Sequence, residues 1–83
     1  METEIGKVTE FFAKPVVAGI QLSQLVKVGD KIHIKGHTTD ITMTVESMQI
    51  NRVNVPEAKP GEVIGIKVPD RVRNGDVVFR VTE

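Results

Sequence analysis

The chain has 83 residues, 40% of them hydrophobic and 27% charged, which suffices for one small core and one domain over residues 1–83. Eleven Lys and Arg balance eleven Asp and Glu, so a dedicated DNA-binding protein is not expected. The sequence has no cysteine, no secretory signal and no apolar run long enough to span a bilayer; it therefore predicts a cytoplasmic protein without disulfides or a membrane partner.

Apolar residues recur with a period of two along most of the chain, which is typical of strands buried on one face. In chain order the pattern predicts strands over residues 5–12, 16–22, 31–35, 41–55, 64–68 and 77–81. Turn signals separate them: Val28-Gly29-Asp30, Pro60-Gly61-Glu62 and Asn74-Gly75-Asp76 each precede a strand. No window has a helical period, so we expect at most a single helical turn.

Six short strands with short loops predict an all-β fold, a small closed six-stranded antiparallel barrel. Closure into a barrel removes the unpaired edges that an open sheet would leave. The expected core consists of apolar residues from five of the predicted strands: Val17, Ile20, Ile32, Ile34, Met43, Val45, Ile64, Ile66 and Val78.

The predicted strand 41–55 changes phase twice. Its apolar residues are odd-numbered up to Val45, even-numbered at Met48 and Ile50, and odd-numbered again from Val53. A regular strand cannot switch faces, so we expect an extra residue near Ser47 and another near 51–52, each accommodated as a bulge. Such bulges would either bend the strand to close the barrel or re-aim side chains beside a site.

The sequence contains no recognisable catalytic motif. It lacks a nucleophile elbow and a glycine-rich phosphate loop, so no nucleotide-binding signature is present. His33 lies on the predicted strand 31–35, and His37 follows the turn at Gly36. Four strand residues cover about 13 Å, too far for two ligands of one zinc ion. We therefore expect no catalytic residue, no metal, no cofactor and no enzymatic activity.

A stripe of cationic and titratable side chains is expected on the outer face of residues 31–37. Its members share the parity opposite to Ile32 and Ile34; they are Lys31, His33, Lys35 and His37. Such a stripe could follow a phosphate backbone, or it could be an ordinary solvated strand face. Trp and Tyr are absent, and the three phenylalanines Phe11, Phe12 and Phe79 lie in apolar runs that favour core packing over base stacking.

Several segments together resemble the second domain of translational GTPases such as elongation factor Tu, elongation factor one-alpha and initiation factor two. The segments that carry the resemblance are 6–8, 25–34, 45–50, 57–66 and 73–78. The resemblance implies a closed antiparallel barrel without the GTPase domain. It also implies an RNA- or ribosome-associated binding module of translation, with transfer RNA or ribosomal RNA as partner.

The resemblance also indicates individual site residues. Arg52 stands where the family has an arginine, Gln49 where it has an acidic residue and Val63 where it has an asparagine. Because the last two positions depart from the family, an RNA surface contact is favoured over a preserved aminoacyl pocket. The complete set of candidate RNA-binding residues is Lys31, His33, Lys35, His37, Gln49 and Arg52.

A second hypothesis is a protein-interaction barrel that acts as an accessory subunit of a separate GTPase or enzyme. Similar barrels occur appended to peptidase-like enzymes, and fold alone does not determine function. Titration with labelled RNA at several salt concentrations would separate the two hypotheses, because phosphate contacts weaken as salt rises.

Overall fold

The computed structural model describes residues 1–14 and 16–82, and throughout these residues the fold is all-β and antiparallel. Its elements are β1 (Glu2–Ala13), β2 (Val16–Leu22), β3 (Val26–Lys27), β4 (Lys31–Lys35), β5 (Asp40–Thr44), β6 (Met48–Ile50), β7 (Val53–Val55), β8 (Glu57–Ala58), β9 (Val63–Lys67) and β10 (Val77–Val81). No helix in this part of the chain could cross a membrane. The predicted all-β, antiparallel class is confirmed.

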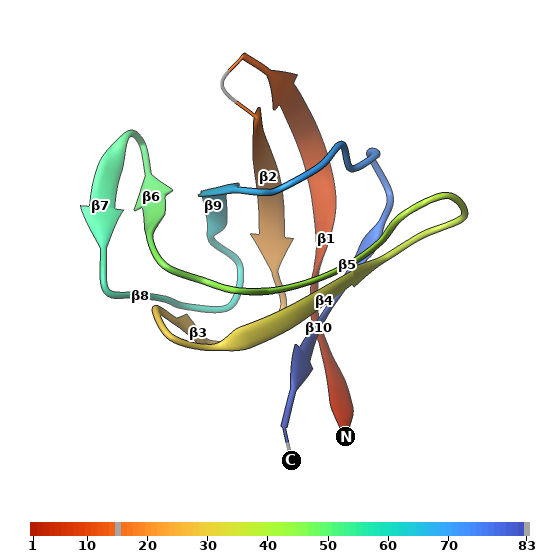
Figure 1. The fold of residues 1–83 in the computed structure, drawn as a ribbon. Coiled ribbons are helices and arrows are strands. Elements are labelled where there is room, and N and C mark those ends of the chain that lie inside the picture. Colours follow the sequence, from red (N-terminus) through yellow and green to blue (C-terminus); the bar gives the residue numbers. More distant parts are fainter. Residues whose placement is uncertain (15, 83) are drawn as a thin grey trace.

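The number of strands and their closure differ from the prediction. One eight-stranded sheet has the order β5-β4-β10-β1-β2-β9-β6-β7, and β3 and β8 form a separate two-stranded sheet. The large sheet curls around the core (Figure 1), but across the described residues no ladder joins its end strands β5 and β7. The expected closed six-stranded barrel is therefore wrong: the sheet is strongly curved and keeps two edges.

The two extra strands of the large sheet arise where two bulges were expected. β5 ends at Thr44, and the chain re-enters the sheet as β6, so the phase change near Ser47 is a strand break. At the second phase change, Asn51 and Arg52 have φ of 53° and 66° and connect β6 to β7 as a two-residue hairpin turn. Irregularities in register lie instead in β1, between Glu4 and Gly6 and between Val8 and Glu10.

The three predicted turns have one common construction. In each, a glycine with positive φ is followed by an acidic residue whose backbone N–H bonds the carbonyl three residues earlier, as in a type II turn. The acidic side chain in turn accepts a hydrogen bond from the N–H of that earlier residue. The pairs are Lys27 with Asp30, Lys59 with Glu62, and Arg73 with Asp76. These turns fix where β4, β9 and β10 begin.

The core fills the inside of the curved sheet. Alternate residues of the central strands are buried there, among them Ile20, Ile34 and Ile66. Of the expected core residues, all but Val17 and Met43 are buried; Met43 packs against the core partly exposed. Val17 has the opposite parity to Ala18 and Ile20, so it faces outwards, where it helps to form the surface described next.

Candidate functional site

The structure divides the six candidate RNA-binding residues between two distant places in the sheet. Lys31, His33 and Lys35 lie on β4, and His37 follows that strand. Gln49 lies on β6 and Arg52 in the turn after it, and four strands separate β4 from β6 in the sheet order. The structure therefore does not assemble them into one surface.

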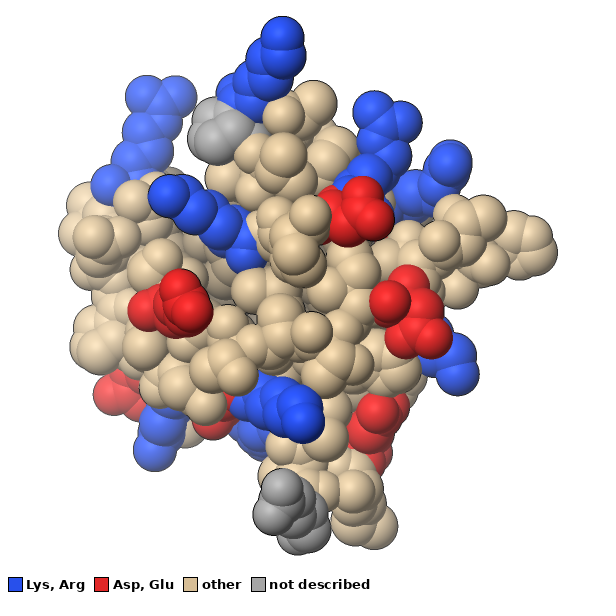
Figure 2. All heavy atoms as spheres, viewed as in Figure 1, with Lys and Arg blue, Asp and Glu red and all other residues tan. Residues whose placement is uncertain are grey.

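The β4 stripe contains a histidine that is already paired with carboxylates. The Nδ1 atom of His33 lies 2.8 Å from Oε2 of Glu2, and its Nε2 atom contacts Asp40. These hydrogen bonds, first that to Asp40 and then that to Glu2, raise the pKa of His33 above its ordinary value of 6.5. Figure 2 shows acidic side chains between the basic ones over the visible face, so no continuous cationic surface forms there.

A different surface feature lies on the outer face of β1, β2, β9 and β6. Gly19 of β2 pairs with Gly65 of β9, and Gly65 pairs in turn with Gln49 of β6. Because Ile20 and Ile64 point into the core, both glycines face outwards. Two adjacent positions of the sheet thus lack a side chain, and a shallow trough results.

The walls of this trough come from the neighbouring rows of side chains. Three adjoining hollows share Val17, and the central one holds about 340 Å³. We call this feature the glycine groove, and its principal lining residues are Phe12, Val17, Gly19, Gln49, Arg52, Val63 and Gly65. Phe12 and Val63 are each 51% exposed, so the walls offer apolar surface to solvent. Phe12 therefore does not pack in the core, contrary to the prediction.

The charged residues at the glycine groove are mainly basic. Lys14 and Arg52 line one end and Lys67 lies towards the other, whereas Glu10 is the acidic residue among the lining side chains. Neither the two lysines nor Arg52 forms an ion pair with any residue that the structure describes. Gln49 is fixed by donating a hydrogen bond from Nε2 to Oδ1 of Asn54, 3.1 Å away.

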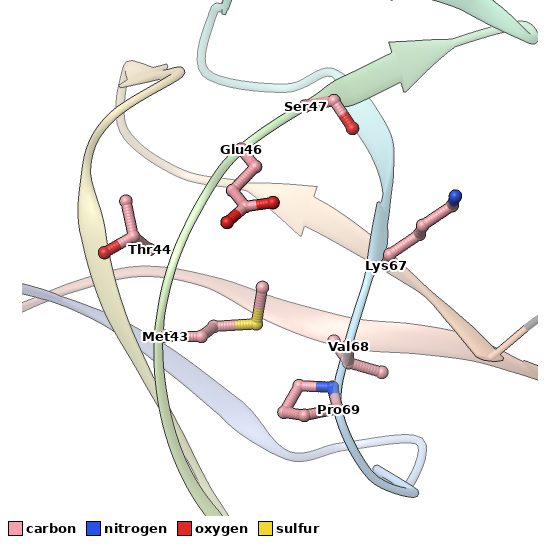
Figure 3. Close-up of a pocket in the computed structure, with 7 residues that line it drawn as sticks. All are labelled: Met43, Thr44, Glu46, Ser47, Lys67, Val68 and Pro69. Carbon is pink, nitrogen blue, oxygen red and sulfur yellow. The ribbon is translucent and has the colours of Figure 1, made fainter.

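Another hollow, of about 430 Å³, lies between the end of β5 and the segment after β9. Figure 3 shows the Met43 side chain directed towards Val68 and Pro69, with the ammonium group of Lys67 pointing away from it. Ser47 and Lys67 border the hollow, but no hydrogen bond in the described part of the chain joins them. Such a pair lacks the nucleophile–base contact that covalent catalysis needs.

Metal-binding chemistry has no assembled ligand set in the described residues. They contain no group of three or more His, Cys, Asp and Glu side chains that could hold a metal ion. The features that could interact with another molecule are thus the exposed apolar walls, the unpaired cations and the side-chain-free floor of the glycine groove.

The amino-acid sequence is similar to parts of two larger proteins. It is 46% identical over 81 residues to a Methanocaldococcus jannaschii protein described as an uncharacterized protease, and 32% identical over 81 residues to a Porphyromonas gingivalis protein described as a collagenase. These matches cover 96% and 95% of this chain but 20% and 22% of the relatives. The chain therefore spans about a fifth of the length of the curated relatives it matches. No protein-family model matches the chain.

The fold is similar to a domain whose structure has been solved. The crystal structure of the C-terminal domain of a Geobacillus thermoleovorans protein described as a U32 peptidase superposes with a TM-score of 0.88. The superposition covers 94% of this chain and 91% of that domain, at 16% sequence identity. At this level of identity the likeness shows a common fold.

These similarities overturn the resemblance to translational GTPases, and with it the interpretation as an RNA- or ribosome-binding module. Most of the segments that carried the resemblance are type II turns and alternating strands, which are ordinary parts of an antiparallel sheet. Gln49, Arg52 and Val63 do border one hollow. The chain, however, is similar over nearly its whole length to segments of proteins described as a protease and a collagenase.

Proposed function

We propose that this chain is a non-catalytic accessory domain that works beside a catalytic unit of the U32 peptidase type and binds it. The observation that carries the proposal is the extent of the similarity, which spans 96% of this chain but 20% of the M. jannaschii relative. The remaining four fifths of such a protein would supply the catalytic unit. The likeness to a C-terminal domain solved by itself supports a separately folded unit.

Met1 and Thr82 lie side by side at one end of the molecule. The backbone N–H of Thr82 donates to the carbonyl oxygen of Met1 at 2.8 Å, beside the start of β1 and the end of β10 (Figure 1). β1 leads from there to Phe12, at the glycine groove. The groove therefore lies away from Met1 and Thr82, at the other end of β1.

The proposal is tested with the M. jannaschii relative. A variant lacking the segment that matches this chain is purified, its folding is checked by circular dichroism, and the 83-residue chain is titrated into it by calorimetry. We expect micromolar binding, and we expect gelatin cleavage by the mixture but not by the chain alone. Cleavage by the chain alone, or no binding to a folded catalytic unit, would contradict the proposal.

A further inference from the structure

The two glycines of the groove floor differ in the room beside them: a Cβ atom on Gly19 would meet Cβ of Glu10 at 3.3 Å, a tight contact, whereas Gly65 has more space. A Cβ atom built on Gly65 would meet Cγ1 of Val17 at 3.6 Å, an ordinary van der Waals contact, and Gly65 is not among the glycines with positive φ. An alanine would therefore fit at this position. In a strand interior glycine is unfavourable, and it often marks a site where a ligand or another backbone approaches closely.

The shape of the groove suits an extended segment of polypeptide. The trough crosses β1, β2, β9 and β6, a span of about 14 Å at the usual strand spacing, or about four residues of extended chain. Val17 and Lys67 stand on one side of the paired glycines, and Gln21 and Val63 on the other. Phe12 and Val63 expose the apolar surface on which an apolar side chain of the segment would pack.

The charges at the groove indicate that the bound segment should be negatively charged. Lys14, Arg52 and Lys67 have no ion-pair partner within residues 1–14 and 16–82, and Glu10 is the single acidic lining residue. An acidic segment would supply the missing partners. A nucleic acid fits less well, because apolar walls contribute little to phosphate contacts and the chain as a whole carries no net charge.

From these observations we propose that the glycine groove binds an extended acidic polypeptide segment with an apolar anchor residue. This inference deepens the proposed function, because such a segment of the catalytic unit would be what the domain recognises. The floor formed by Gly19 and Gly65 admits the backbone of the segment, and Arg52 and Lys67 pair with its carboxylates.

The test uses the 83-residue chain, isotopically labelled, and the capped peptide Glu-Leu-Glu-Phe-Glu followed by NMR. We expect chemical-shift changes centred on Gly65, Phe12 and Val63, and weaker binding as salt rises. The matched peptide with Lys in place of Glu should not bind. Changes centred elsewhere, equal binding of the Lys peptide, or binding of a single-stranded RNA oligomer in place of the acidic peptide would overturn the inference.

Variants of the chain sharpen the test. Gly65→Leu places a side chain over the groove floor, and its Cβ atom is accommodated by the fold. This variant should weaken peptide binding by about tenfold or more through steric exclusion. Arg52→Asn removes a charge but tolerates the left-handed turn, and should weaken binding about threefold to fivefold. The control Lys31→Gln removes the same charge from β4, away from the groove, and should leave binding unchanged.

The same variants separate this inference from the proposed function. If Gly65→Leu, shown to be folded by its NMR spectrum, binds the catalytic unit as tightly as the parent does, the groove is not the docking site, although the accessory role stands. If the peptide binds in the groove but the folded catalytic unit binds nothing, the accessory role fails and the peptide site stands.

Discussion

The β4–β10 side of the sheet and the glycine groove both contain glycine, but the space beside the glycine is used differently. At Gly36, which follows β4, a Cβ atom would collide with the carboxylate of Asp76, a buried side chain that accepts a hydrogen bond from the N–H of Arg73. At Gly65 a Cβ atom would meet one ordinary contact. The space beside Gly36 is thus filled by the Asp76 carboxylate, which would have to shift to admit a side chain there.

Charged side chains show the same difference. On the β4–β10 side, His33 is held by two carboxylates, and Arg80 donates to the carbonyl oxygen of Leu25 and lies 3.7 Å from Asp30. At the groove, Arg52 and Lys67 have no such partners among the described residues. The comparison teaches that the half-buried His33 and Arg80 are paired within the protein, whereas the groove leaves space beside Gly65 for another molecule. Exposed cations without an ion pair among the described residues occur on both sides, as Lys31 and Lys35 on β4 show.

The largest effect is expected at the close approach of Gly36 to Asp76. Gly36→Ala should lower the free energy of unfolding by about 1 to 3 kcal/mol, as overpacking of a filled site does. Urea unfolding followed by circular dichroism measures this. A loss below about 0.5 kcal/mol, the usual size for a surface change, would mean that Asp76 can move aside and that this side is not tightly filled.

A smaller loss of stability on the β4–β10 side is expected from a change at Arg80. Arg80→Met keeps much of the apolar stem but removes the hydrogen bond to Leu25 and the ion pair with Asp30, and should cost about 1 kcal/mol. The matched control is Arg73→Met, because no ion pair of Arg73 is seen with the described residues. Equal losses of unfolding free energy in the two variants would show that the partners of Arg80 do not add to stability.

The paired His33 on β4 should make the stability of the protein depend on pH. Because its pKa in the folded protein is raised above 6.5, its contribution to stability is complete below pH 6.5 and is lost as pH rises through the folded pKa. His33→Gln should therefore destabilise by about 0.5 kcal/mol at pH 5.5, and by less at pH 8.5. Urea unfolding at both pH values measures the difference. The matched control is His37→Gln, because no side-chain hydrogen bond or ion pair of His37 is seen with the described residues.

The smallest effect on stability is expected in the groove. Gly65→Ala should change the free energy of unfolding by less than about 0.5 kcal/mol, or raise it slightly, because alanine restricts the unfolded chain and fits the folded one. Urea unfolding beside Gly36→Ala provides the direct comparison. A destabilisation as large as that of Gly36→Ala would show that the groove floor is needed for folding, and the contrast between the two regions would then disappear.

Local signals were sufficient for much of the fold. The alternation over residues 31–35 and the glycine–acid turns depend on residues close in sequence, and both were predicted. The hairpin at Asn51–Arg52 was missed, although two residues between two alternating runs are a hairpin signal. Arginine in a left-handed conformation is uncommon, which made a bulge in one continuous strand the more obvious interpretation.

The candidate site depended on pairings that no local pattern contains. Gly19 and Gly65 are separated by many residues and become neighbours through the β2–β9 register. Phe12 was expected in the core because it follows Phe11 in an apolar run. In a strand, however, consecutive side chains point to opposite faces, and Phe12 faces the groove. That parity rule was a usable signal for Phe12.

The sequence by itself determined the all-β class, the positions of the three glycine–acid turns and most of the core, because alternation, turn residues and apolar burial act over a few residues. Only the tertiary structure decided how the sheet ends. It also decided that the space beside Gly36 is occupied by Asp76 and that the space beside Gly65 is open. Strand order and register set these features, and both arise from contacts between residues far apart in the chain. For the same reason His33 is paired with Glu2, whereas Arg52 lies at the groove.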